Sequence, residues 1–491
     1  MEDPNLKVLI IGAGIGGLAL AVLLEKAGIA YEVYERASKV RPLGSAVQLN
    51  ANILPFFQQL GICDDIRKFG KPVEYTRVVG QNLQSLGQID ATEVEQRMGY
   101  PSIIVARPEL YDLLLSQVPV SKIHMSKKIT SVEQDLSSTM QPGTAVKITC
   151  SDGTVAHGDL IVGADGAYSV VRQHIYDDLL KKNKLPASDA KELSFSHVCL
   201  VGTTKELDPE RYPILKQPDA RHSILMGPPK MRYSVWCFTV PQNRICWFVT
   251  LQMQKASSKS KEEKLVNNSE WGPEAAEAMC QQVKDYKTPY GGELGDLIEN
   301  TDKTLISKVM LEEKQFKTWY DGRAVLLGDA CHKMLPSGGQ GAINAMHDAI
   351  ILANMIYDIR ENTTPEIADA FKKYRDARFA QAEYHINTSK QLGKILMGVS
   401  FWDRIIRKIA LNYVPKFLIR MAMDKQGVYQ PQAGFLPLFP YKGFIAPLSQ
   451  EPCKRYVEKQ QRQAEQTNQA QRKATEAAIV EPKVAAATVG L

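Results

Sequence analysis

Residues Lys7 to Glu35 read KVLIIGAGIGGLALAVLLEKAGIAYEVYE, and this stretch decides the fold. An apolar strand runs into the glycine turn Gly12-x-Gly14-x-x-Gly17, an apolar helix follows, and a second strand ends in an acid. Gly12 permits the tight turn, Gly14 lets backbone N–H groups approach a pyrophosphate, and Gly17 lets helix and strand pack closely. Glu35 would accept a hydrogen bond from a ribose hydroxyl. Together these parts predict an adenine dinucleotide site.

The same segment is uncharged from Val8 to Leu24 and approaches the length of a membrane span. Its glycines favour a turn instead. The start MEDPNL is acidic, and no small-residue cleavage site follows a short apolar core, so a signal peptide is disfavoured.

Composition excludes several classes of protein. A chain of 491 residues buries a large core and is expected to hold two or more structural units. The 8 cysteines form no C-x-x-C pair, which predicts neither a zinc site nor a disulfide framework and favours a reducing compartment, the cytoplasm. The 8 histidines make no metal-ligand spacing, so we expect no metal. A formal charge of +6 without a dense basic stripe argues against nucleic-acid binding.

Two further stretches join a strand to a helix through a glycine turn. Residues Asp152 to Arg172 read DGTVAHGDLIVGADGAYSVVR, with a buried strand at Leu160 to Val162. Residues Ala324 to Asn354 read AVLLGDACHKMLPSGGQGAINAMHDAIILAN, with a helix expected to begin near Gly341. The Pro/Gly-rich loop before that helix would expose N–H donors at a positive dipole end, which suits an anionic or electron-rich ring.

In combination, the three stretches resemble the class A flavoprotein monooxygenases, the family of p-hydroxybenzoate hydroxylase, over roughly Lys7 to Arg378. The resemblance implies an α/β fold: a Rossmann-like FAD-binding domain, an antiparallel β-sheet substrate domain and a C-terminal helical region. We expect the FAD-binding domain at 1–75, 101–185 and 300–380, and the substrate domain at 76–100 and 186–299. The helical region would cover 381–453, followed by a polar tail at 454–491 that is disordered or a frayed helix.

The resemblance also implies which residues bind FAD. The motif for the ADP half matches the first glycine turn and Glu35, and Glu35-Arg36 leads into a flavin-side segment with Gly44 and Ser45. An arginine that contacts the cofactor matches Arg107 in RPELYDLLL. The D-G motif of relatives supports FAD and the nicotinamide donor; here it matches Asp159, Gly163, Asp165, Gly166, Ser169 and Arg172. The G-D motif, whose carboxylate holds the ribityl chain, matches Gly328 and Asp329, with Pro336, Gly341 and Ala342 close to the isoalloxazine. Each of these residues stands at the matching position of its motif in the sequence.

In this family NADPH or NADH reduces FAD, and the reduced flavin captures O₂ as a C4a-hydroperoxide that transfers oxygen to an electron-rich carbon. The chain has no second G-x-G-x-x-G for a separate nicotinamide domain, which agrees with a donor that binds transiently. The loop GDACHKMLPSGGQGAIN is closest to fungal enzymes of secondary metabolism that epoxidise or hydroxylate lipophilic or aromatic intermediates. The sequence leaves hydroxylation and epoxidation open.

Strand-like runs lie between Leu193 and Gln252 and predict the antiparallel sheet that would roof a substrate cavity. Its aromatic residues are candidates for the lining, although about half of each strand's side chains pack in the core: Trp236, Phe238, Trp247 and Phe248. No catalytic residue is identified. Tyr212 and Arg221 are candidate polar contacts, and His332 is a candidate base beside the flavin.

Residues 400–423 mix large apolar residues with basic ones, and Pro415 interrupts any continuous helix. Two interpretations stay open, a peripheral contact with a membrane surface and a cap packed on the core with solvated basic residues. Relatives commonly end in transmembrane helices, whereas the tail here is polar.

Three alternative functions compete with this prediction. A flavin halogenase is disfavoured because the W-x-W-x-I-P run is missing. An FAD-dependent reductase of isoprenoid double bonds shares the fold and would differ by consuming no O₂. A non-enzymatic relative that acts as a prenyl-protein chaperone would be expected to lack Asp329 and the glycine loop, and both are present.

Overall fold

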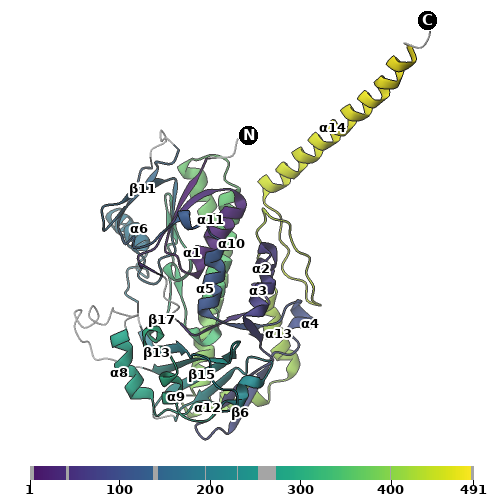
Figure 1. Cartoon of the computed structure of the whole chain (residues 1–491). Coiled ribbons are helices and arrows are strands. Elements are labelled where there is room, and N and C mark those ends of the chain that lie inside the picture. Colours follow the sequence, from purple (N-terminus) through teal and green to yellow (C-terminus); the bar gives the residue numbers. More distant parts are fainter. Residues whose placement is uncertain are drawn as a thin grey trace.

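The computed structural model describes residues 5–39, 44–136, 142–193, 195–228, 231–252, 273–398 and 400–487. Two large sheets and the helices around them account for most of the body of the molecule, and a long C-terminal helix projects away from it (Figure 1).

The first large sheet carries the dinucleotide-type segment. Its 6 strands are parallel except for the edge strand β19, which runs antiparallel to β20. The order across the sheet is β19 (Tyr320–Asp321), β20 (Ala324–Leu326), β12 (Leu160–Gly163), β1 (Lys7–Ile11), β2 (Ala30–Tyr34) and β8 (Ile123–His124). The carboxyl ends of the three central strands therefore meet at one edge, where open α/β sheets bind ligands.

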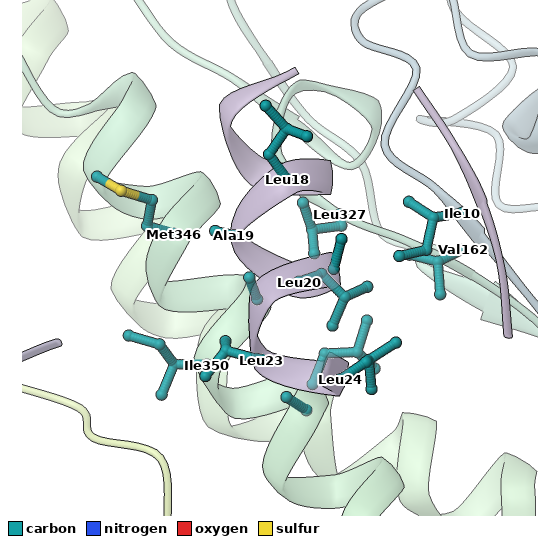
Figure 2. Packing of buried hydrophobic residues seen from close by; sticks show 14 of the residues in the cluster. Ile10, Leu18, Ala19, Leu20, Leu23, Leu24, Val162, Leu327, Met346 and Ile350 are labelled. Atoms are coloured by element: carbon teal, nitrogen blue, oxygen red, sulfur yellow. The ribbon is translucent and has the colours of Figure 1, made fainter. Parts of the chain in front are cut away.

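Two helices bury the inner side of this sheet. Helix α1 (Ile15–Ala27) lies between the sheet and α10 (Gly341–Tyr357), and Figure 2 shows Ile10 and Val162 on its sheet side, with Met346 and Ile350 on its other side. Every residue of α1 from Ile15 to Leu24 is buried, which explains why the segment carries no charge. It is a core helix.

The second large sheet has 7 strands. Their order is β17 (Ser307–Glu312), β13 (Phe195–Thr203), β16 (Arg244–Gln252), β15 (Tyr233–Val240), β14 (Ser223–Met226), β5 (Tyr75–Val79) and β6 (Ser85–Asp90). All neighbours are antiparallel except the parallel pair β14 and β5. Strand β17 falls inside the range predicted as FAD-binding, so the predicted boundary at residue 300 does not coincide with the edge of this sheet.

The two faces of the second sheet pack against different partners. One face packs on α8 (Pro273–Val283) and α9 (Leu294–Glu299), which Figure 1 shows beside it. The opposite face packs on a small sheet that includes β7 (Ile103–Ala106) and on the end of α11 (Thr364–Met397). Because strand side chains alternate, neighbouring residues have different surroundings.

The remaining elements connect these layers. The small sheets are β3 (Ala46–Leu49), β7 and β4 (Gly70–Pro72); β11 (Val155–Gly158), β10 (Val146–Cys150) and β9 (Ile129–Gln134); and β18 (Lys314–Gln315) with β21 (His332–Lys333). Within the described ranges before residue 398, the other α-helices are α2 (Leu54–Leu60), α3 (Cys63–Lys68), α4 (Val94–Met98), α5 (Arg107–Ser116) and α6 (Val170–Lys181). The predicted α/β class, with an antiparallel-type second sheet and a helical C-terminal region, is confirmed.

The C-terminal region forms α12 (Phe401–Asn412), α13 (Lys416–Gly427) and α14 (Lys454–Ala487). Pro415 caps α13 and separates it from α12, as its position in the sequence predicts. Of the two forms expected for the tail, disorder and a frayed helix, residues 454–487 take a helical form, a helix of 34 residues (Figure 1). Among the described residues, every helix is too short or too polar to cross a membrane.

Candidate cofactor and substrate site

Of the three glycines in the turn, one has room for a Cβ atom and the other two do not. Gly12 has a φ of +105°, and a Cβ there would lie 2.5 Å from the Ala164 carbonyl oxygen. A Cβ on Gly17 would lie 2.0 Å from the Gly12 carbonyl oxygen, so the helix and the turn touch. A Cβ on Gly14 would meet nothing within 4 Å. The turn thus presents an open backbone at Gly14, the N-cap of α1, where no side chain caps the helix.

Glu35 organises this turn from the end of β2. Its carboxylate accepts hydrogen bonds from the Ala13 N–H at 2.9 Å and the Ala37 N–H at 2.9 Å. The sequence suggested a ribose contact alone and missed these bonds. Arg36 beside it is exposed.

Residues from four segments converge on Arg107, the first residue of α5. Its N–H donates to the Ser45 carbonyl oxygen at 2.9 Å, and a Cβ on Gly44 would lie 2.8 Å from its Cδ. The Gly44 carbonyl oxygen accepts from Thr203 Oγ1 at 3.4 Å, which brings the second sheet to the same place. Burial lowers the pKa of the Arg107 guanidinium, and the nearby Asp329 carboxylate opposes that shift. Residues 41–43, the start of the predicted flavin-side segment, lie outside the described residues.

Asp329 lies in the short 3₁₀ turn that follows β20, directly after Gly328, whose φ is +63°. Its side chain is 39% exposed and forms an ion pair with Lys333 at 2.5 Å. The carboxylate is therefore at the ligand-binding edge of the sheet and outside the core, in line with the predicted contact to a ribityl chain.

Helix α10 begins at this edge with a free approach to its N-terminus. Its N-cap residue Gln340 makes no side-chain cap, its first turn holds no acid, and a Cβ on Gly341 would meet nothing within 4 Å. Ala342 is partly buried in this turn. The positive end of the α10 dipole would favour negative charge on a bound ring.

The D-G segment divides between the two edges of the sheet. Asp165 accepts a hydrogen bond from the Val170 N–H at 2.7 Å, and Ser169 accepts one from the Arg172 N–H at 3.0 Å, so both cap α6. Burial raises the pKa of Asp165. Asp159 lies at the opposite edge, where it accepts from the Lys7 N–H at 2.8 Å. The structure does not bring Asp159 to the glycine turn.

Arg172 is a buried side chain that links α6 to the turn after β20. Its Nη1 donates to the Ala330 carbonyl oxygen at 2.9 Å, and its guanidinium lies 4.2 Å from the Phe316 ring centroid. It therefore ties α6 to the turn that carries Asp329.

A buried ionic network beneath the Gly328 turn was missed from the sequence. Asp348 Oδ2 lies 2.6 Å from His332 Nε2 and accepts from the Gly328 N–H at 3.0 Å. Its Oδ1 accepts from Arg378 Nε at 2.7 Å. All three side chains are essentially inaccessible. Burial by itself would raise the pKa of Asp348, but its contacts with His332 and Arg378 outweigh burial and lower that pKa to about 2. The sequence did contain a signal for this network, because Asp348 is an acid within the mostly apolar run HDAIILAN.

The position of His332 in this network argues against the prediction that it acts as a base. The ring is 1% exposed, its Nε2 is bound to Asp348, and it packs 5.4 Å from the Trp319 ring. It supports the turn from below and is not among the residues that line the pocket described next.

A pocket lies between the second sheet and the Pro336 loop. Its sheet wall is aromatic, with the rings of Trp236 and Phe248 stacked 5.1 Å apart. Beside them Ser234 and Thr250 share a hydrogen bond of 2.6 Å. The other walls are Pro336 and Ser337 and the end of α11, at Gly393, Leu396 and Met397. The α11 wall was not foreseen.

Of the other predicted contacts, only Phe238 shares this face of the sheet, where it packs 4.4 Å from His222. Trp247 points to the opposite face and donates to Thr301 Oγ1 at 3.0 Å. Tyr212 packs on that same outer cluster, and Arg221 pairs with Asp219 at 2.8 Å. None of these four is among the residues that line the pocket.

The comparison with protein families identifies the family of the chain. Residues 5–385 match the model of a family described as "FAD binding domain". The chain belongs to this FAD-binding family. A relative, the FAD-dependent monooxygenase paxM of Penicillium paxilli, is 30% identical over 423 residues, which cover 84% of this chain and 83% of paxM. The FAD-dependent monooxygenase penE of Penicillium thymicola is 30% identical over 451 residues, 89% of each chain.

Solved structures of the family agree with the fold. Klebsiella pneumoniae HpxO complexed with FAD and uric acid superimposes with a TM-score of 0.67 at 22% identity, over 87% of this chain and 97% of that one. The family match and the curated relatives make the protein an FAD-dependent monooxygenase of the secondary-metabolite type, and its cofactor is FAD. The prediction of the family from the three motifs is confirmed.

Proposed function

We propose that this FAD-dependent monooxygenase uses NAD(P)H and O₂ to hydroxylate or epoxidise a lipophilic or aromatic small molecule in secondary metabolism. The observation that carries the proposal is the pocket that Trp236 and Phe248 share with Pro336. Pro336 belongs to the loop expected beside the isoalloxazine, so the aromatic pocket adjoins the expected place of the reacting ring.

The residues present fit FAD. The open backbone at Gly14 accommodates a pyrophosphate, and the open approach at Gly341 accommodates the polar edge of a flavin. Glu35, Arg107 and Asp329 would hold the ribose, the cofactor body and the ribityl chain. When bound, FAD would supply the redox chemistry, accepting hydride from NAD(P)H and activating O₂ as a C4a-hydroperoxide.

The protein's own contribution is positioning and exclusion of water. The apolar walls of the pocket would orient an electron-rich ring or double bond, and the Ser234 and Thr250 hydroxyls would contact an oxygen of the substrate. The uncapped N-terminus of α10 would stabilise negative charge on the reduced ring.

We place the activity in the cytoplasm, since all eight cysteines are buried and none of them forms a disulfide bond. Contact of residues 400–423 with a membrane surface is proposed on separate grounds below.

The decisive experiment is a screen of lipophilic and aromatic compounds for those that accelerate NAD(P)H oxidation with matching O₂ uptake and an oxygenated product. Trp236→Ala should uncouple the reaction, so that NAD(P)H oxidation continues with more H₂O₂ and less product. NAD(P)H oxidation that reduces a substrate double bond without O₂ uptake would establish the reductase alternative instead.

A further inference from the structure

Helix α12 carries its apolar side outwards. Trp402, Ile406, Ile409 and Tyr413 follow one another at intervals of three or four residues, which places them on one stripe along the helix. Their exposed fractions are 69%, 47%, 49% and 67%. The usual arrangement on a globular protein is the reverse, with the apolar stripe against the core.

The inner side of α12 carries polar anchors beside one apolar contact, Leu411, which packs on the inner cluster of the second sheet. Asp403 is buried and closes a capping box with Ser400. Arg407 points inward, where its Nη1 donates to the Leu396 carbonyl oxygen at 2.6 Å, and burial lowers its pKa. Packing against the protein therefore does not explain the outward stripe from Trp402 to Tyr413.

The exposed apolar surface continues on α13, where Phe417 is 59% exposed and Met421 62%. The charges around it have one dominant sign. Residues 400–423 contain five basic residues and one acid, the buried Asp403. Arg407 is turned inward and Arg420 pairs with Glu93, so the basic residues that accompany the apolar surface are Arg404, Lys408 and Lys416. This combination of outward aromatic and aliphatic residues with basic ones is complementary to an anionic lipid surface.

We infer that α12 and α13 dock on the surface of a bilayer containing anionic lipid, with the stripe from Trp402 to Tyr413 inserted at the boundary between headgroups and acyl chains. Neither helix is long and apolar enough to cross the bilayer. A second copy of the chain is the less suitable occupant, because a symmetric contact would set the basic residues of one face against the same residues of the other.

Docking has a consequence for the pocket. Leu396 and Met397 line it, and Arg407 binds the Leu396 carbonyl, so the docked helix is directly connected to the pocket wall. Under the proposed function, a lipophilic substrate dissolved in the bilayer would enter near this wall. Surface binding itself does not depend on that function.

The test uses the full-length holoenzyme and vesicles of phosphatidylcholine with or without phosphatidylserine. We expect sedimentation with the anionic vesicles, weaker binding at high salt, and a blue shift of Trp fluorescence that Trp402→Phe reduces. Ile406→Ser with Ile409→Ser should weaken binding about tenfold or more, since both side chains leave the apolar boundary.

Phe444→Ser is the matched control, because Phe444 is 73% exposed but lies outside both helices; its binding should equal that of the unaltered protein. Equal binding by the double variant and the control, or no binding to anionic vesicles, would overturn the inference. So would a dimer in light scattering that the double variant abolishes, since the face would then be covered by a second copy. Bound flavin and NAD(P)H oxidation, measured in parallel, report on the proposed function separately.

Discussion

At the scale of single residues, the acids of this chain have two kinds of role. Asp329 stands partly exposed at the ligand edge of the first sheet, whereas Asp348 is fully buried beneath the same turn. Glu35 would combine both roles, because it holds the glycine turn and is proposed to bind the ribose. Substitutions of these acids should therefore separate cofactor binding from folding.

Asp329→Ala should weaken FAD binding about tenfold or more, through loss of a charged hydrogen bond, while the far-UV circular dichroism stays unchanged. Bound flavin is measured after desalting. Asp369→Ala is the control, because Asp369 forms an exposed ion pair with Lys373 at the same four-residue spacing. A parallel loss of fold and flavin in Asp329→Ala would mean that the residue is structural.

Glu35→Ala should lower both FAD retention and the melting temperature of the apoprotein, because the Ala13 and Ala37 N–H groups lose their acceptor as well. Each charged hydrogen bond contributes about 1–3 kcal/mol. Glu35→Gln keeps one acceptor oxygen, so its FAD retention and melting temperature should lie between those of Glu35→Ala and those of the unaltered protein. An apoprotein of unchanged stability would contradict the structural half of this prediction.

Asp348→Ala should lower the free energy of unfolding by about 3–5 kcal/mol, since it leaves Arg378 buried without its carboxylate. Urea unfolding measures the change. Adding Arg378→Met should restore part of the loss, because the second substitution removes the uncompensated charge. A double variant no more stable than the single one would show that the network does not act as a pair.

At the scale of elements, the N-terminus of α10 is the feature that we expect to act on the cofactor. Gly341 leaves the approach open and no acid occupies the first turn. The alternation of side chains along the second sheet sends Trp236 to the pocket proposed for the substrate and Trp247 to the outer cluster.

Ala342→Asp should make the flavin's reduction potential more negative and slow its reduction by NAD(P)H. An acid in the first turn opposes negative charge on the reduced ring, an interaction of about 0.3–2 kcal/mol. Ala342→Asn is the neutral control of equal size. Equal potentials in the two variants, with FAD bound in both, would mean that the helix end does not face the ring.

At the scale of the whole molecule, stability should depend on buried neutral histidines. Burial lowers the pKa of His222 to about 3 and that of His385 to about 4, from an ordinary value near 6.5. The unfolded chain therefore takes up protons below pH 6.5 that the folded chain does not. Stability is full above pH 6.5 and is lost as the pH falls towards 4, by about 1.4 kcal/mol per pH unit for each histidine.

His385→Gln should consequently lose about 2 kcal/mol less than the unaltered protein between pH 6.5 and 5. Urea unfolding at the two pH values measures the difference. His157→Gln, at an exposed position, should follow the unaltered protein.

The sequence alone determined whatever depends on neighbours along the chain. Strand, glycine turn and helix follow from local conformation and periodicity, so the dinucleotide segment, the start of α10 and the break at Pro415 were predicted where they are found. The combination of three such motifs sufficed for the family and for FAD.

Only the tertiary structure decided which distant residues meet. Asp348 joins His332 and Arg378, 16 and 30 positions away, and Leu396 completes a pocket whose aromatic wall lies on β15 and β16. A strand pattern shows that side chains alternate but not which face meets the cofactor domain, so Trp236 and Trp247 could not be told apart. The outward stripe of α12 was likewise hidden, because amphipathicity gives a helix two faces and only packing fixes which of them remains in solvent.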